Sequence, residues 1–284
     1  MRVAAVQLNS TDETAANLAS ADSHVRAAAA DGASLVVLPE KWTVMGAKDK
    51  LLAGAQALDG PAISWARAIA AELRIDLVAG SITERVPGAQ KLANTCVHVD
   101  PTGEIRALYR KIHMFDVEID GKLYRESELE EPGDEIASSE TASGLPIGLA
   151  ICYDLRFPEL FRILALRGSL LITLPSAFTL PTTRDHWETL IRARAIENQA
   201  FLVAANQVGK HPDGYESGGR SMIVDPWGRV LASLGEHGEG HVVAEIDLAA
   251  QEQVRRKLPS LANRVPRAYR WPEGLAASEA PLAG

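Results

Sequence analysis

Cysteine is scarce in this sequence, and its scarcity excludes two classes of protein. The 284 residues include two cysteines, Cys96 and Cys152, which are too few for the disulfide framework of a small secreted domain. They do not form a C-x-x-C pair, so the sequence does not indicate a metal site. No apolar run approaches the ~18 residues that a membrane-spanning helix needs. We therefore expect neither a metal nor a membrane partner.

Positive charge is also limited. The sequence has 29 Lys and Arg against 37 Asp and Glu, a formal net charge of −8, whereas nucleic-acid binding rewards clustered Lys and Arg. We therefore expect no nucleic-acid partner. The first residues, MRVAAVQL, form a strand-like run without the pattern of a signal peptide. Hydrophobic residues make up 46% of the sequence, which is enough for a large core. Together these features predict a cytoplasmic protein.

Several active-site motifs are missing as well. The sequence contains no G-x-S-x-G, no Walker A sequence and no glycine-rich phosphate fingerprint. The local signatures of papain-like and caspase-like cysteine proteases are also absent. A serine hydrolase, a nucleotide-binding enzyme and a Cys–His protease are therefore disfavoured.

Short apolar runs alternate with longer amphipathic patterns, which is typical of an α/β protein. The expected strands of the first half cover residues 3–8, 35–38, 77–80, 95–100 and 105–110, and the expected helices cover 11–30 and 61–73. The second half repeats this order: GLAICYD (148–154) matches VAAVQLN (3–9), LITLP (171–175) matches LVVLP (35–39), VAAN (203–206) matches VAGS (78–81), and DPWG (225–228) matches DPTG (100–103). We interpret this as an old duplication.

Each half has a sheet with helices on one face and a bare apolar face opposite. Two halves of this kind can bury their bare faces against each other, which predicts a four-layer α-β-β-α sandwich from two pseudo-symmetric halves. A further strand (240–247) and a last helix (249–256) complete a domain over residues 1–256. Residues 257–284 carry four prolines, so we predict an extended C-terminal arm.

Three expected strands end in chemically reactive residues. Glu40 follows the strand at 35–38, Lys111 follows 105–110, and Cys152 follows the apolar run at 148–151. Sites of open α/β sheets lie beyond the carboxyl ends of strands, and a thiol near a helix N-terminus is a candidate nucleophile. Each residue taken singly also fits a structural role, since a free cysteine is often buried core. Cys96 fits that structural role well.

Taken together, four segments resemble the signature blocks of the nitrilase, or carbon–nitrogen hydrolase, superfamily. They are LVVLPE, YRKIHMFD, GLAICYDLRFPEL and RARAIENQ, and the similarity runs from about Met1 to Tyr269. The resemblance implies the four-layer sandwich and a catalytic triad of Glu40, Lys111 and Cys152. It also implies a second glutamate, for which Glu126 fits best and Glu128 is the alternative. No cofactor is implied, and members of the superfamily usually form homodimers or larger homo-oligomers.

Amide hydrolysis gives each of these residues a physical role. Glu40 would take the thiol proton and later protonate the leaving ammonia. Lys111 and the backbone N–H of Tyr153 would stabilise the developing oxyanion. Glu126 would orient Lys111.

Nitrile-cleaving members typically carry Cys-Trp-Glu, whereas this chain has Cys152-Tyr153-Asp154, which favours amides. The sequence is most similar to the branch of omega-amidase and deaminated-glutathione amidase, which implies a small amide substrate that carries a carboxylate. Arg156 is the expected carboxylate-binding residue, and an ion pair with Glu159 is its structural alternative. The expected substrate-binding residues are Tyr153, Arg156, Phe178 and His186.

Other functions stay open at this stage. An N-carbamoyl-amino-acid amidohydrolase and an aliphatic amidase or nitrilase would use the same triad. A non-catalytic interaction scaffold on the same fold is the alternative of a different class.

Overall fold

The computed structural model describes residues 1–119 and 121–270. Six strands form the first sheet in the order β16-β1-β2-β3-β4-β5. Their bounds are β1 Arg2–Gln7, β2 Leu35–Val37, β3 Asp76–Glu84, β4 Ala93–Val99, β5 Ile105–Arg110 and β16 Gly240–Glu245. The strands β1, β2 and β3 are parallel, and the others join antiparallel. Helices α1 (Thr14–Ala30) and α3 (Pro61–Leu73) pack on this sheet.

The second sheet repeats this arrangement in the order β8-β9-β10-β11-β14-β15. Its strands are β8 Ser138–Glu140, β9 Pro146–Leu149, β10 Leu171–Ser176, β11 Phe201–Asn206, β14 Met222–Val224 and β15 Val230–Ser233. Again the three inner strands β9, β10 and β11 are parallel. Helices α4 (Pro158–Leu166) and α6 (Glu188–Asn198) pack on this sheet.

The duplication that the sequence predicts is visible strand by strand. Both D-P-x-G segments join the antiparallel strands that follow the three parallel ones, and both close with the same turn. Gly103 N–H donates to Asp100 C=O at 2.9 Å, and Gly228 N–H donates to Asp225 C=O at 2.9 Å. These are the bonds of the β-turns that the sequence favours.

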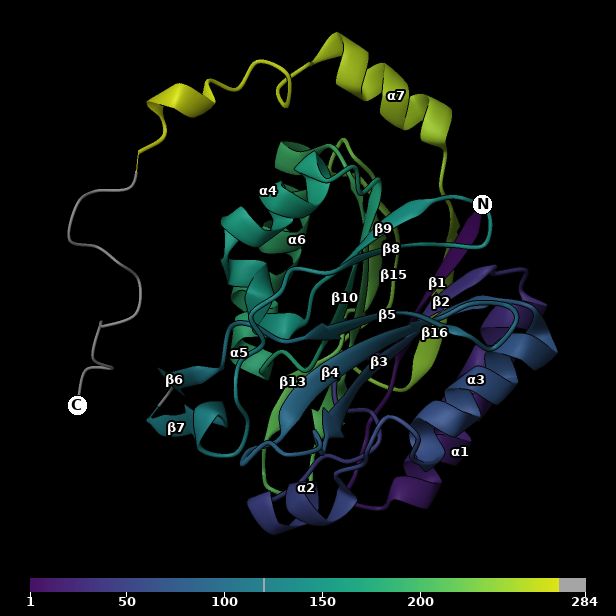
Figure 1. Ribbon diagram of the computed structural model, residues 1–284, viewed down its shortest axis with the longest axis vertical. Helices are drawn as coiled ribbons and strands as arrows, with labels where there is room; N and C mark the ends of the chain where they lie inside the picture. The colour runs from purple at the N-terminus through teal and green to yellow at the C-terminus, as the bar shows by residue number, and fades with distance from the viewer. Residues whose placement is uncertain (120, 271–284) are drawn as a thin grey trace.

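The two sheets face each other in the middle of the molecule, with β1 against β11 and β3 against β10. One apolar core fills the space between the sheets and continues under α4 and α6, and a second lies under α1 and α3. Figure 1 shows the resulting layers of helix, sheet, sheet and helix. The predicted four-layer sandwich is confirmed.

Several short elements are not predicted from the sequence. They are α2 (Lys48–Gly54), the hairpin of β6 (Asp116–Ile119) and β7 (Lys122–Arg125), η1 (Glu126–Glu128), η2 (Cys152–Arg156), α5 (Leu180–Thr182), the π-helical turn η3 (Thr183–Trp187), and the pair β12 (Val208–Lys210) and β13 (Glu216–Gly218). None is long enough to show a helical or strand period in the sequence. Segments between α2 and β13 supply much of the pocket described below.

The chain continues past β16 into α7 (Leu248–Lys257), which the Asp247 side chain caps by accepting the N–H groups of Ala249 at 2.9 Å and Ala250 at 3.0 Å. Residues 258–270 then run along the outside of the molecule, with a short turn η4 at Pro266–Ala268 (Figure 1). The division into a domain at 1–256 and an arm at 257–284 stays a prediction, and residues 271–284 lie outside the described residues. None of the described helices is long and apolar enough to cross a membrane.

Candidate active site

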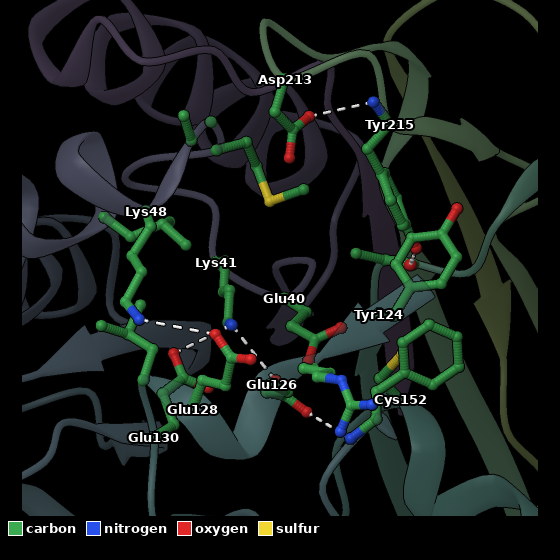
Figure 2. Close-up of a pocket in the computed structure, with 18 of the residues that line it drawn as sticks. Glu40, Lys41, Lys48, Tyr124, Glu126, Glu128, Glu130, Cys152, Asp213 and Tyr215 are labelled. Atoms are coloured by element: carbon green, nitrogen blue, oxygen red, sulfur yellow. Dashed lines mark hydrogen bonds and ion pairs between the residues drawn. The ribbon is translucent and has the colours of Figure 1, made fainter. Parts of the chain in front are cut away.

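The loops after three strands bring Glu40, Lys111 and Cys152 together. Glu40 follows β2, Lys111 follows β5, and Cys152 follows β9 on the facing sheet. The backbone fixes two of these positions directly: Glu40 N–H donates to Ser176 C=O at 3.3 Å, and Lys111 N–H donates to Asn94 C=O at 2.9 Å. Figure 2 shows Glu40, Glu126 and Cys152 around one pocket.

Cys152 has a backbone conformation that few residues other than glycine adopt. Its φ is +47°, and such strained positions cluster at functional sites. Cys152 also begins the 3₁₀ helix η2, so the N–H groups of Cys152 and Tyr153 have no partner within that helix. Cys152 is 6% exposed. Its thiol contacts the Glu40 carboxylate and the Ala177 backbone N–H. The same turn therefore carries the sulfur and two backbone N–H groups that are not bonded within its helix.

The fully buried Asp154 anchors this turn to the loop that carries Lys111. Its carboxylate accepts Ile151 N–H at 2.8 Å and the Tyr109 hydroxyl at 2.7 Å. It also contacts His113 Nδ1 at 2.7 Å, and the His113 ring stacks on Phe157 with centroids 3.6 Å apart. Asp154 thereby fixes the position of Cys152 relative to Lys111.

Lys111 bridges two carboxylates. Its Nζ donates to Glu40 Oε1 at 3.1 Å and to Glu126 Oε2 at 2.7 Å. The Asn94 amide joins the same carboxylates, with Nδ2 donating to Glu40 Oε1 at 2.8 Å and to Glu126 Oε1 at 3.3 Å. Phe115 N–H adds a bond to Glu126 Oε2 at 2.8 Å. Both oxygens of Glu126 are therefore occupied, which suits a positioning role.

A second lysine extends this network. Lys41, with φ +48°, places its Nζ 3.1 Å from Glu126 Oε1 and 2.9 Å from Glu130 Oε1. The side chain of Glu130 is fully buried. A chain of alternating charge therefore runs from Glu40 through Lys111, Glu126 and Lys41 to Glu130.

Burial and neighbouring charge set the protonation states of this chain. Burial opposes the charge of Lys111, but Glu126 and Glu40 raise the pKa of its ammonium well above the usual range. Burial also opposes the charge of Glu126, but Lys111 and Lys41 hold its pKa well below the usual range. Burial, with the Glu40 carboxylate, raises the pKa of the Cys152 thiol. The resting site thus holds a cationic Lys111, an anionic Glu126 and a neutral thiol.

These residues line a pocket of about 520 Å³. Its wall also includes apolar and aromatic side chains from α2, β7 and the loops around them, namely Met45, Leu51, Phe115, Leu123, Tyr124, Leu129 and Tyr215. Tyr215 donates a hydrogen bond to the C=O of Ala177, the residue whose backbone N–H contacts the Cys152 thiol. The pocket therefore combines a reactive polar group with apolar walls, as ligand sites commonly do.

The structure gathers the four residues predicted to be catalytic, Glu40, Lys111, Glu126 and Cys152, around one pocket. The alternative second glutamate, Glu128, also lines it, but 57% of its side chain is exposed and it pairs with Lys48 at 3.6 Å. Of these two glutamates, Glu126 contacts Lys111.

The four predicted substrate-binding residues do not belong to this lining. The guanidinium of Arg156 lies 3.4 Å from His186 Nδ1 and above the rings of Tyr153 and Phe178. Within the described residues Arg156 forms no ion pair with Glu159. A role in substrate binding for Tyr153, Arg156, Phe178 and His186 stays a prediction.

Sequence reasoning missed Asn94, Lys41, Glu130 and Tyr215. Lys41 directly follows Glu40, and Asn94 lies on β4 beside the end of β5, so strand-end position was an available signal for both. Glu130 and Tyr215 lie in irregular segments, where no periodic pattern indicates which side chains turn inward.

Comparison with known proteins shows the family of this chain. The model of the carbon-nitrogen hydrolase family matches residues 2–256. A deaminated glutathione amidase of Synechocystis sp. (strain PCC 6803 / GT-S) is 38% identical over 92% of this chain and 97% of that protein. The omega-amidase NIT2 of Homo sapiens is 38% identical over 91% of this chain and 92% of that protein.

Solved structures also match more than nine-tenths of this chain. The NitFhit protein of C. elegans superposes with a TM-score of 0.88 at 38% identity, over 95% of this chain and 66% of that one. Nit3 of Saccharomyces cerevisiae, a nitrilase superfamily member, superposes with a TM-score of 0.83 at 32% identity, over 91% of this chain and 94% of that one. The chain therefore belongs to the carbon-nitrogen hydrolase family and is an amidase of the nitrilase superfamily.

Proposed function

We propose that this amidase hydrolyses small amides that carry a carboxylate, of the omega-amide or deaminated-glutathione type, through a thioester on Cys152. One observation carries the chemistry: Lys111 Nζ bridges Glu40 at 3.1 Å and Glu126 at 2.7 Å in the pocket that contains Cys152. The substrate type rests on the similarity to amidases with those names.

In the first half of the reaction, a neutral thiol must lose its proton as it attacks. Because burial and Glu40 raise the pKa of Cys152, the sulfur becomes nucleophilic when the Glu40 carboxylate takes its proton. The S–C bond forms at the amide carbonyl, and Lys111 with the Tyr153 N–H stabilises the negative oxygen. The C–N bond then breaks, the nitrogen takes the proton from Glu40, and ammonia leaves, or an amine when the substrate is a substituted amide.

The second half consumes the thioester. Glu40, again a carboxylate, removes a proton from water while the water oxygen attacks the thioester carbonyl. The S–C bond breaks, sulfur recovers the proton, and the carboxylic acid leaves. Lys111 keeps its charge throughout because its pKa is raised well above the usual range, so it acts electrostatically and Glu40 transfers the protons.

A substrate panel tests this function. Hydrolysis is measured with succinamate, deaminated glutathione, butyramide, an N-carbamoyl amino acid and a nitrile, for the wild type and Cys152→Ala. The product followed is ammonia, except for deaminated glutathione, whose substituted amide releases a peptide amine. We expect the first two substrates to give the highest kcat/KM and the variant to release none. Preference for the carbamoyl compound, butyramide or the nitrile would show that the protein has another activity of its family. Equal hydrolysis by the wild type and the variant would contradict Cys152 chemistry, and no hydrolysis by either would favour a scaffold.

We also propose a homodimer or larger homo-oligomer. Large apolar side chains on α4, on α6 and in the turn after β14 are exposed in the single chain: Ile163, Leu166, Ile196 and Trp227. A second copy that covered them would remove this apolar surface from water. Sedimentation velocity over a concentration series tests the proposal, and a monomer at every concentration would contradict it. The cytoplasmic location stays a prediction from the sequence.

A further inference from the structure

Five cationic side chains line the pocket, and three of them have a carboxylate partner. Lys111 and Lys41 pair with Glu126 at 2.7 and 3.1 Å, and Lys48 pairs with Glu128 at 3.6 Å. The other two, Lys122 and Arg125, are the first and last residues of β7. Within the described part of the chain, neither has a carboxylate within 4.0 Å. Strand β7 therefore brings positive charge to the pocket that no carboxylate of the described residues pairs with.

Aromatic rings hold Lys122 at this pocket. Its Nζ lies 5.4 Å from the centroid of the Tyr124 ring and 5.8 Å from that of Tyr215, distances at which a ring face attracts a cation. The hydroxyl of Tyr215 is bonded to Ala177 C=O, and the Ala177 N–H meets the Cys152 thiol. The ring of Tyr215 thus spans from the surroundings of the nucleophile to the ammonium of Lys122.

This arrangement suits a substrate that has an amide at one end and a carboxylate at the other. We infer that Lys122, with Arg125 on the same strand, receives the carboxylate of the substrate whose amide reacts at Cys152. Leu123 and Phe115 line the same pocket and provide apolar contacts for a short chain that joins the two ends. The inference rests on the proposed function, because it assigns the second functional group of the same substrate.

Arg156 is the competing position. It lies outside the pocket lining, and its guanidinium is engaged with His186 and with the rings of Tyr153 and Phe178. To receive the carboxylate it would have to leave these contacts. Lys122 also lies over two rings, but it already lines the pocket that contains Cys152.

The test compares succinamate with butyramide, which have the same number of carbons but differ in the terminal carboxylate. Lys122→Gln should lower the ratio of kcat/KM for succinamate over butyramide by about tenfold, mainly through KM, because a charge-assisted contact is lost. Lys122→Arg, which keeps the charge, should retain most of the ratio. In the wild type, KM for succinamate should rise with salt, since Lys122 is exposed and screened.

Two variants serve as matched comparisons. Lys48→Gln removes a lysine from the same pocket whose charge already pairs with Glu128, and it should leave the ratio within about twofold. Arg156→Gln tests the competing position. If Arg156→Gln lowers the ratio and Lys122→Gln does not, the inference is wrong and the carboxylate binds at Arg156.

Binding is measured separately from turnover. Calorimetry of succinamate with Cys152→Ala, and with Cys152→Ala combined with Lys122→Gln, reports on the subsite in a protein that cannot form the thioester. Weaker binding by about tenfold in the double variant supports the subsite even if the wild type hydrolyses no amide, in which case only the proposed function fails. Equal binding in both proteins, or an unchanged ratio in an active Lys122→Gln enzyme, overturns the subsite and leaves the amidase function standing.

Discussion

Lys41 Nζ lies 2.9 Å from Oε1 of Glu130, a carboxylate whose side chain is fully buried. Burial raises the pKa of Glu130 to about 7, although the charge of Lys41 acts in the opposite direction. Glu130 therefore ionises in the neutral pH range, while Lys41 and Glu126 stay charged. The pair adds a pH-dependent charge near Glu126, the glutamate that holds Lys111, because Lys41 contacts both carboxylates.

The first prediction concerns this titration. The pKa of Glu130 in the folded protein, about 7, exceeds the value of 4.5 for an unperturbed glutamate, so the folded state binds the proton more tightly. The resulting stabilisation is complete below pH 4.5 and is lost as the pH rises through about 7. Glu130→Gln should flatten this decline in Tm between pH 5 and 8. Glu128→Gln, at an exposed position, is the control, and a wild-type slope in Glu130→Gln would contradict the assignment.

The second prediction concerns the stability of the buried pair. Lys41→Met leaves the carboxylates of Glu130 and Glu126 without a cation that both contact, and should lower the free energy of unfolding by about 3–5 kcal/mol. Combining it with Glu130→Leu should restore part of that loss, because the buried charge is removed as well. Denaturant titration measures both variants. Additive losses would show that the two side chains do not interact.

The third prediction separates the two cysteines. Cys152→Ala should abolish turnover with the fold intact, since the thiol contributes mainly chemistry. Cys96→Ala should keep the chemistry and lose some stability, because Cys96 is fully buried in the core between the sheets. Mass spectrometry after brief iodoacetamide treatment should find Cys152 alkylated first. Faster labelling of Cys96 would argue against Cys152 as the nucleophile.

The fourth prediction concerns the oxyanion donor. Lys111→Ala should lower kcat by about 10²-fold or more. Lys111→Arg should not restore it, because a planar guanidinium cannot occupy the place of an ammonium that bridges Glu40 and Glu126. Steady-state kinetics on the best amide of the panel measures both variants. A kcat near that of the wild type in either one would remove Lys111 from the mechanism.

The fifth prediction concerns the anchor at Asp154. Tyr109→Phe deletes the hydroxyl that reaches Asp154 Oδ2 at 2.7 Å, and should cost about 1.5–3 kcal/mol of stability because a buried charged acceptor loses a donor. It should also lower kcat more than it changes KM, since Asp154 holds the turn that carries Cys152. Tyr269→Phe, at an exposed position, is the control. Unchanged stability and kcat in Tyr109→Phe would show that the bond is dispensable.

Local patterns in the sequence predict the sandwich and the strand ends that carry Glu40, Lys111 and Cys152. Alternation of apolar and polar residues and the repeated D-P-x-G turns are local patterns, so they can be recognised along the chain. The resemblance to signature blocks then assigned Glu126. Helix α3 and strand β5 have the predicted bounds, Pro61–Leu73 and Ile105–Arg110.

Which side chains meet depends on how the chain folds in three dimensions. Lys111 and Glu40 are 71 positions apart in the chain and Asn94 and Glu40 are 54 apart, so their contacts depend on the register of β2, β4 and β5 and on the packing of the two sheets. Lys41 and Glu130 form a pair because both are folded into the same buried pocket wall, which no local period encodes. Lys122 faces that pocket, and Arg156 lies outside its lining, for the same reason: short loops and hairpins take their conformation from the core on which they pack.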